Sequence, residues 1–461
     1  MPPPIEAEAK YNPKRHNSFG VEYDLYEFGQ RSQPIDITIV SHAYNHEAYL
    51  DDFFRGVTSQ KTSYNYELLI LDDASQDRTF DLLEKHAALC NFPVKIIRYV
   101  DNSNHHNVVT HLHIREHLTG RFFAFCEVDD YWVCEEKLDL QTKQLDSDPG
   151  LSWSITKAIR HDMSNGEDIT MIDFDLSDQE TMSSELALLA WGQLPTCTML
   201  FRRKVYDVFV EHMRKESCKR IVEHHFVLIA IGLGGCAYIP TITGVYRYRR
   251  PESFTNAVIF NTSSKMDFYD DVSRSFAKIA IAMNNRLLSA ATSKLVIWQN
   301  SQVIPHRYRH LFHDELLSSL SLYINTHQPV YIYGIGYIGS YIIENLSKLL
   351  NIHGVIDKNG GGAYKGYSVL ALNQFASSVS QDNQPHILIT PLGISSVIQE
   401  SIASQTGLDN SFLYPLGDVL LDHLLEGPMA YCSDLIKGID SSALAKLPTP
   451  ASKGPIPPAS Q

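Results

Sequence analysis

Between residues 35 and 132 the chain alternates between two hydrophobic periods. Short apolar runs have the spacing of buried strands: IDITIV, YELLILDDAS, VKIIRYV and RFFAFCEVDDYW. The segments between them carry apolar positions at helical spacing: EAYLDDFFRGVTSQ, DRTFDLLEKHAALC and HLHIREHLTG, the last of which Gly120 is expected to close. Strands that alternate with helices predict an open, mostly parallel α/β sheet.

Five regions are expected along the chain. Residues 1–34 are polar and contain proline, and they are interpreted as an N-terminal tail. Residues 35–255 are predicted to form the first α/β domain, and residues 256–327, which lack strand patterns, a helical connector. A second, smaller α/β unit is predicted for residues 328–425, and residues 426–461 are a C-terminal segment with a Pro/Ser-rich tail.

The composition indicates a globular protein and argues against several classes. Of the 461 residues, 44% are hydrophobic and 20% are charged. The chain has 39 Lys and Arg residues and 53 Asp and Glu residues, so its net charge is −14. Nucleic acid is therefore not expected as a partner. Seven scattered cysteines without a C-x-x-C pair, and an N-terminus without an apolar signal segment, favour a reduced, cytoplasmic setting.

One uncharged stretch is long enough to cross a membrane. Phe226–Tyr246 spans 21 residues, but it contains four glycines and Pro240. These residues predict a helix, a turn and a strand instead of a membrane span.

Carboxylates follow two of the predicted strands. Asp72 and Asp73 end one strand, and Glu127, Asp129 and Asp130 end another. The carboxyl ends of parallel strands line one crevice, so both groups are expected to face it. Clustered carboxylates are hard oxygen ligands, suited to Mg²⁺ or Mn²⁺ that holds a diphosphate. For Asp72 and Asp73, capping of the following helix is an equally good explanation.

Three motifs in this order resemble the family 2 glycosyltransferases: IVSHAYNHEAYL, LLILDDASQDRT and FFAFCEVDDYWVCEEKL. That family has a GT-A fold and transfers sugars from nucleotide donors with inversion. The resemblance implies a donor of UDP or GDP type, a saccharide or glycolipid acceptor, and bound Mn²⁺ or Mg²⁺. Peripheral association with the inner face of a membrane is compatible with these partners and stays open.

The resemblance also implies roles for single residues. Contacts with the nucleotide are expected at Tyr44, Asp72, Asp73 and Glu127. His42 is a further candidate for the nucleotide pocket because of its place at the end of the first predicted strand. The metal ligands are expected at Asp129 and Asp130.

Further on, WGQLPTCTMLFRRKV and EHHFVLIAIGLGGCAYIPTITGVYRYRRPESFT resemble the acceptor-side half of the same fold. By this resemblance Glu223 is the general base, although most relatives have Asp there, and Arg249 stands where they tend to have His. A carboxylate in reach of the acceptor hydroxyl removes its proton during attack on the anomeric carbon. Trp191 is a candidate for stacking on the acceptor sugar, with a place in the core as the alternative.

Histidines crowd the segment between the third and fourth predicted strands: His105, His106, His111, His113 and His117. The spacing of His113 and His117 places two imidazoles on one helix face, as in some zinc sites. Ordinary surface histidines are the favoured interpretation.

The second α/β unit begins with a glycine-rich turn. Gly334, Gly336 and Gly339 follow the strand VYIY, and Asp357 ends the next strand. This context is what a G-x-G-x-x-G turn needs to bind a nucleotide phosphate. The unit resembles the Rossmann-like, nucleotide-sugar-binding domain at the start of sugar O- and N-acyltransferases, and a docking domain without ligand is the alternative.

Two other functions stay open: an NAD-dependent oxidoreductase or epimerase that uses this unit, and a non-catalytic nucleotide-sugar-binding protein.

Overall fold

The chain divides at Asn261/Thr262 into two compact units. The computed structural model describes residues 10–18, 20–29, 33–102, 108–172, 181–182, 187, 194–213, 224–250, 253, 262–301, 309–324, 327, 329–357, 360–379, 384–392, 394–426 and 429.

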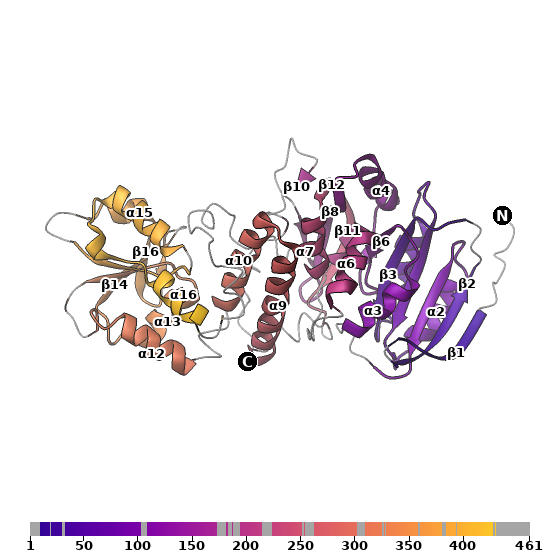
Figure 1. Cartoon of the computed structure of the whole chain (residues 1–461), viewed down its shortest axis with the longest axis horizontal. Helices are drawn as coiled ribbons and strands as arrows, with labels where there is room; N and C mark the ends of the chain where they lie inside the picture. Colours follow the sequence, from indigo (N-terminus) through magenta and orange to yellow (C-terminus); the bar gives the residue numbers. More distant parts are fainter. Residues whose placement is uncertain are drawn as a thin grey trace. The chain divides into compact units, whose positions relative to one another are not determined.

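The first unit is built on one mixed sheet with the strand order β1-β2-β5-β4-β3-β6-β11-β8-β12-β10 (Figure 1). Its central strands run parallel: β5 (Val94–Tyr99), β4 (Tyr66–Asp72), β3 (Ile37–Ala43) and β6 (Phe122–Phe125). The flanking strands are β1 (Lys10–His16), β2 (Glu22–Phe28), β11 (Met199–Arg202), β8 (Leu151–Asp162), β12 (Gly235–Tyr248) and β10 (Thr181–Met182). Two short strands lie off this path: β7 (Tyr131–Trp132) pairs with β12, and β9 (Glu167–Met171) pairs with β8. The predicted α/β sheet is confirmed.

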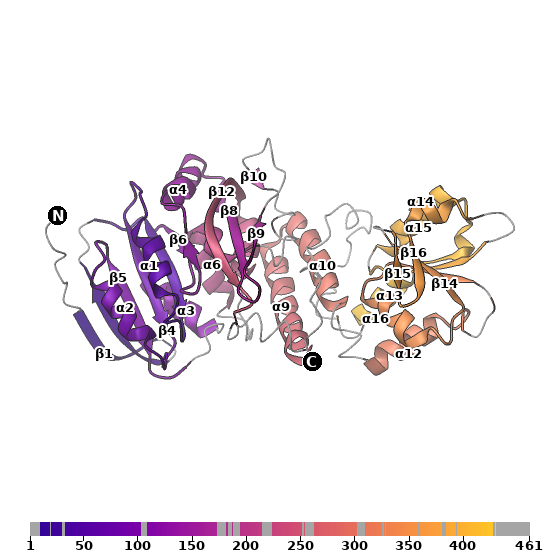
Figure 2. The same ribbon diagram turned by 180° about the vertical axis from the view of Figure 1, so that it is seen from behind.

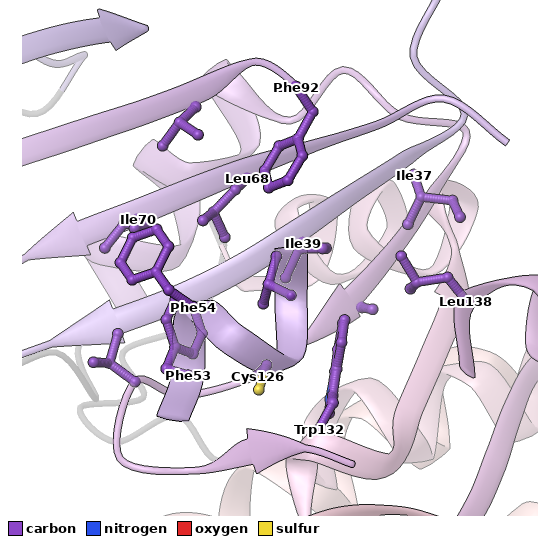
Figure 3. Packing of buried hydrophobic residues seen from close by; sticks show 14 of the residues in the cluster. Ile37, Ile39, Phe53, Phe54, Leu68, Ile70, Phe92, Cys126, Trp132 and Leu138 are labelled. Atoms are coloured by element: carbon purple, nitrogen blue, oxygen red, sulfur yellow. The ribbon is translucent and has the colours of Figure 1, made fainter. Parts of the chain in front are cut away.

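Helices cover both faces of this sheet. On one face α1 (Leu50–Thr58), α2 (Thr79–Ala87) and α4 (Lys137–Ser147) share a hydrophobic core with the central strands. Figure 3 shows Phe53 and Phe54 of α1 packed over Ile39 and Ile70. On the other face lie α3 (Val108–His117), α6 (Arg203–Met213) and α7 (His224–Leu233), where Phe226 stacks on Phe209. Alternating strand residues therefore serve two separate cores.

The interpretation of residues 1–34 as a tail was wrong for the hairpin β1–β2. Strand β2 pairs antiparallel with β5 and extends the sheet by two strands. Tyr23, Leu25 and Phe28 of β2 are buried. The segment EYDLYEF carries apolar side chains on both faces, because Tyr23 packs against α3 whereas Tyr26 and Phe28 join the core of α2. The acids between these residues gave the segment the appearance of a polar tail.

Gly120 does not close helix α3 as predicted, because the helix ends at His117. A Cβ at Gly120 would lie 2.6 Å from both the Phe122 oxygen and the Thr38 nitrogen. Glycine is therefore required for close backbone packing at the start of β3 and β6.

The second unit combines helices with a smaller sheet. It begins with α9 (Thr262–Met283), α10 (Arg286–Ser301) and α12 (Arg309–Ser319), in agreement with the helical pattern of this stretch. The sheet has the order β15-β16-β14-β13-β17-β18, and all its pairs are parallel except β15 with β16. The strands are β13 (Val330–Tyr333), β14 (Ile352–Ile356), β15 (Ala363–Tyr364), β16 (Tyr367–Leu370), β17 (His386–Ile389) and β18 (Leu413–Tyr414).

The helices of this sheet lie on both of its faces. Helices α14 (Leu372–Ala376) and α15 (Ser395–Thr406) lie on one face, and α13 (Tyr337–Leu346) and α16 (Leu416–Glu426) on the other (Figure 2). Phe375 and Ile402 of the first pair pack on Ile387 and Ile389 of β17.

The uncharged stretch Phe226–Tyr246 forms most of α7 and β12, as its glycines predicted. In the described part of the chain, no helix has both the length and the apolar character needed to span a membrane.

Candidate functional site

The two groups of acids meet at the carboxyl edge of the parallel strands. Strand β3 lies between β4, which ends at Asp72, and β6, which is followed by Glu127. The backbone nitrogen of Asp73 donates to the Ala43 oxygen at 3.0 Å, and that of Val128 donates to the His42 oxygen at 3.3 Å. Both acid-bearing segments are thus fixed to the end of the same strand, as the sequence predicted.

Glu127 is held by His42. The backbone nitrogen of His42 donates to Glu127 Oε2 at 2.8 Å, and its Nδ1 lies 3.0 Å from the same oxygen. His42 is 5% exposed. The bond orients the Glu127 carboxylate along the strand end, so these two predicted site residues are joined to each other.

Asp130 lies inside the protein. Its Oδ1 accepts the backbone N–H of Arg247 at 2.9 Å, and its own nitrogen donates to the Glu127 oxygen at 2.9 Å, which closes a turn over residues 127–130. Burial, together with the neighbouring charge of Asp129, raises the pKa of Asp130 well above its usual range. An ionised Asp130 therefore needs positive charge close by.

Two arginines at the end of β12 supply positive charge. Arg250 forms an ion pair with Asp129 at 3.0 Å. Arg247 donates to the backbone oxygen of Asp129 at 2.7 Å and also binds Asp52 of α1. Its guanidinium lies 4.5 Å from the centre of the Tyr131 ring, within cation–π range. Both guanidinium groups are buried, so they interact strongly with the acidic turn.

Helix α1 packs tightly against the segment that follows these acids. A Cβ on Gly56 would lie 2.6 Å from the Trp132 oxygen. The Trp132 side chain is buried in the core (Figure 3). Its Nε1 donates to the backbone oxygen of Cys197 at 2.9 Å. The turn that carries Asp129 and Asp130 is therefore fixed from both sides.

Asp72 and Asp73 have no exposed surface. Burial raises the pKa of Asp72 to about 6, although Ser75 and Arg98 partly offset the effect. Helix α2 begins at Thr79, and the Thr79 nitrogen donates to Asp77, so Asp72 and Asp73 do not cap the helix. The capping alternative is therefore excluded.

A cleft of about 420 Å³ opens beside Asp72. Its walls come from β2, the end of β5 and the loops that follow β4 and β5: Asp24, Ala74, Ser75, Gln76, Arg98, Tyr99, Val100, Asp101 and Asn102. The Asn102 side chain donates to the backbone oxygen of Asp73 at 3.1 Å, which links the cleft to the segment that carries the acids.

The carboxylates fit a divalent cation only in part. Asp129 offers hard oxygen ligands and its side chain is 18% exposed, whereas Asp130 Oδ1 already accepts a backbone bond. Among the residues that the structure describes, Glu127, Asp129 and Asp130 do not converge as a three-ligand group. Asp129 is thus the acid best placed to reach a cation, with Arg250 as its present partner.

Two predicted residues, Trp191 and Glu223, lie outside the described residues. Helix α7 begins at His224, directly after Glu223. Tyr44 is partly buried in the loop after β3. Arg249 forms an ion pair with Asp162 of β8 at 3.2 Å.

The contacts of Arg247 with Asp52 and Asp130 were not predicted from the sequence. Asp52 is separated from Arg247 by 195 positions, and Asp130 by 117. The one signal was the run YRYRR after an apolar strand, which marks a cluster of positive charge but not its partners.

Residues 38–209 match the family model described as glycosyl transferase family 2. They form a glycosyltransferase family 2 domain. The sheet around this domain is of the α/β type that the sequence predicted.

The glycosyltransferase domain is similar to several known proteins. The uncharacterized protein Rv1520 of Mycobacterium tuberculosis is 30% identical over 217 residues, which are 46% of this chain and 58% of that protein. The chain thus spans less than two thirds of that relative's length. The putative teichuronic acid biosynthesis glycosyltransferase TuaG of Bacillus subtilis is 28% identical over 105 residues, 23% of this chain and 40% of that protein. The solved structure of S. aureus TarS 1-349 in complex with UDP-GlcNAc covers 60% of this chain and 75% of its own, with a TM-score of 0.43 and 16% identity.

The histidines of α3 in the glycosyltransferase domain are not ordinary surface residues, contrary to the prediction. His111 and His113 are buried, because α3 lies between the sheet and α6. Burial lowers the pKa values of His113 and His117 to about 4, with Arg15 as a further cause for both. Both rings are therefore neutral at neutral pH.

The glycine-rich turn at residues 334–339, outside the glycosyltransferase domain, has the backbone conformation that its sequence predicted. Gly334 has a φ of +92°, and a Cβ on Gly339 would lie 1.9 Å from the Gly334 oxygen. Gly336 is the N-cap of α13, and Asp357 accepts a bond from the Ile335 nitrogen at 3.2 Å. The turn thus has the close packing that the motif requires, and nucleotide binding there stays a prediction.

Proposed function

We propose that this protein transfers a sugar from a nucleoside-diphosphate sugar, of UDP or GDP type, to a hydroxyl of a saccharide or glycolipid acceptor. The main support is the acidic turn Glu127–Asp130 at the carboxyl edge of a parallel sheet, within a glycosyltransferase family 2 domain. Ligands of such sheets bind at this edge.

The donor nucleotide occupies the cleft beside β4 and β5. Its volume of about 420 Å³ suits a nucleoside, and its walls offer the hydroxyl of Ser75, the guanidinium of Arg98 and the amide of Asn102. Tyr44 and Asp73 contribute further contacts to the base and the ribose.

The diphosphate lies at the acidic turn. Mn²⁺ or Mg²⁺ held by Asp129, with Asp130 and Glu127 in support, would stabilise the charge of the leaving nucleoside diphosphate. Arg250 adds positive charge at the same place, since it already lies 3.0 Å from Asp129. Arg247 keeps the turn in position through its bonds to Asp129 and Asp52.

Glu223 is the general base. It takes the proton of the acceptor hydroxyl as the acceptor oxygen bonds to the anomeric carbon and the bond to the diphosphate breaks. One displacement inverts that carbon and needs no covalent enzyme intermediate. Trp191 stacks on the acceptor sugar.

A panel of UDP- and GDP-sugars tests this proposal on the full chain. Thermal unfolding is measured with and without Mn²⁺, and the release of nucleoside diphosphate is then followed. We expect a Mn²⁺-dependent rise in unfolding temperature with at least one donor. Asp129→Asn should lose this rise, whereas Asp168→Asn, an exposed acid of β9, should keep it.

Glu223→Gln separates binding from chemistry. The variant should bind the donor as the wild type does and lose transfer. Normal turnover in Glu223→Gln would remove this residue from the mechanism. A retained nicotinamide, visible near 340 nm, without any response to nucleotide sugars would instead favour an oxidoreductase.

A further inference from the structure

Helix α3 carries three metal-binding side chains within one turn. His113, Glu116 and His117 each offer one ligand atom, and these atoms lie within 4.8 Å of one another. Positions i, i+3 and i+4 of a helix share one face. Across the described ranges, this is the one group of three or more His, Cys, Asp or Glu side chains whose ligand atoms converge in this way.

His113 has a nitrogen available for a ligand. Its side chain is fully buried, and Nδ1 lies 2.9 Å from the Tyr99 hydroxyl. Nε2 is also buried, and it has no hydrogen-bond partner among the described residues. When Nδ1 carries the proton and donates it to Tyr99, Nε2 presents a lone pair. Metal-bound histidines have this arrangement, because their second nitrogen donates to a neighbouring oxygen.

The other two ligands come from the same helix face and contact the β1–β2 hairpin. The His117 ring centre lies 5.1 Å from that of His113, and Tyr23 of β2 packs against both rings. Glu116 accepts a hydrogen bond from Ser18, which lies between β1 and β2. Glu116 is exposed, so an ion can reach the site from solvent.

The charges around this face allow a cation. Lys95, which donates to the His117 backbone oxygen, forms an ion pair with the fully buried Glu67 at 3.3 Å. Arg15 is exposed to solvent, and Glu116 brings one negative charge. Both imidazoles are neutral at neutral pH, which is the form that binds a metal.

We propose that His113, Glu116 and His117 form a Zn²⁺ site on the face of helix α3 that packs against the β1–β2 hairpin. Two imidazoles and one carboxylate are a ligand set that Zn²⁺ accepts, with a water molecule in the fourth position. Mg²⁺ and Ca²⁺ prefer oxygen ligands alone. This site therefore differs in metal preference from the acidic turn at Glu127–Asp130.

Zinc binding by the tag-free full chain tests the proposal. The protein is equilibrated with Zn²⁺ in excess Mg²⁺, which occupies the acidic turn, and the zinc that remains after gel filtration is measured by atomic spectroscopy. The variants are His117→Gln and Glu116→Gln, which change accessible side chains. The matched control is His353→Gln, an exposed histidine of β14. Unfolding of each variant in zinc-free buffer shows that it folds, and Co²⁺ absorption reports the coordination geometry.

We expect about one zinc ion per chain in the wild type and in His353→Gln, together with a Zn²⁺-dependent rise in unfolding temperature. His117→Gln should lose both, and Glu116→Gln should bind zinc roughly tenfold more weakly or worse. A wild type that retains no zinc, or a folded His117→Gln that retains as much as the wild type, would overturn the proposal. Neither result depends on sugar transfer.

Discussion

Asp72→Asn is expected to stabilise the glycosyltransferase domain at neutral pH and to lose this advantage in acid. The Asp72 carboxyl has no exposed surface, and its compensating contacts are long: the Ser75 nitrogen at 3.4 Å and Arg98 at 3.5 Å. Burial therefore raises its pKa from 3.8 to about 6. An asparagine has nearly the same shape and keeps an oxygen for Ser75.

The magnitude follows from this pKa. Between about pH 4 and pH 6 the folded wild type holds a proton on Asp72 that the unfolded chain has lost, so its stability falls as the pH rises. At about 1.4 kcal/mol for each unit of pKa, the ionised carboxyl costs up to about 3 kcal/mol above pH 6. Asparagine does not ionise. The difference between variant and wild type should thus grow from near zero below pH 4 to as much as about 3 kcal/mol above pH 6.

Urea unfolding across this pH range measures the difference, with tryptophan fluorescence as the signal. Trp132 and Trp153 are both buried in the first unit. At each pH, the free energy of unfolding of the wild type is subtracted from that of the variant, which removes the contribution of other titrating groups. Asp101→Asn, which changes an exposed carboxyl of the same cleft, should show no pH-dependent gain. A pH-independent difference for Asp72→Asn, or a loss of stability at neutral pH, would refute the reasoning.

Three further substitutions test the packing and the arginine contacts. Gly56→Ala should lower the stability of the first unit by about 1–3 kcal/mol in thermal unfolding, because the new Cβ meets the Trp132 oxygen at 2.6 Å; unchanged unfolding would contradict the close packing. Arg247→Lys should reduce turnover roughly tenfold or more while donor binding persists, since an ammonium cannot bind two oxygens as the guanidinium fork does; wild-type turnover would exclude a positioning role. Gly339→Ala should destabilise the second unit, where the Cβ would lie 1.9 Å from a backbone oxygen, whereas Gly336→Ala has open space and should be neutral; equal effects of the two would count against the tight turn.

The elements of the first sheet could be predicted because their signals are local. The apolar runs that became β3, β4 and β6 are short, and helical spacing separates them. Acids follow two of these runs, those of β4 and β6. The position of Asp72 and Glu127 at one edge then follows from the parallel arrangement alone.

Long-range contacts could not be predicted in the same way. Arg247 reaches Asp52 and the turn of Asp130 only because β12 pairs with β8 and β7 in the folded sheet. The burial of His113 depends on Tyr99 of β5 and on Tyr23 of the hairpin, and neither contact is visible in the pattern of α3. Local periodicity says which face of a helix is apolar, but not how many neighbours cover it.

The place of Arg247 and Arg250 has a consequence for engineered chimeras. The family match ends at residue 209, yet the side chains that hold the acidic turn come from the end of β12, some forty positions later. A hybrid enzyme joined at the family boundary would combine the turn of one parent with the guanidinium groups of another. Junctions beyond residue 250 keep the acidic turn together with the two arginines that hold it.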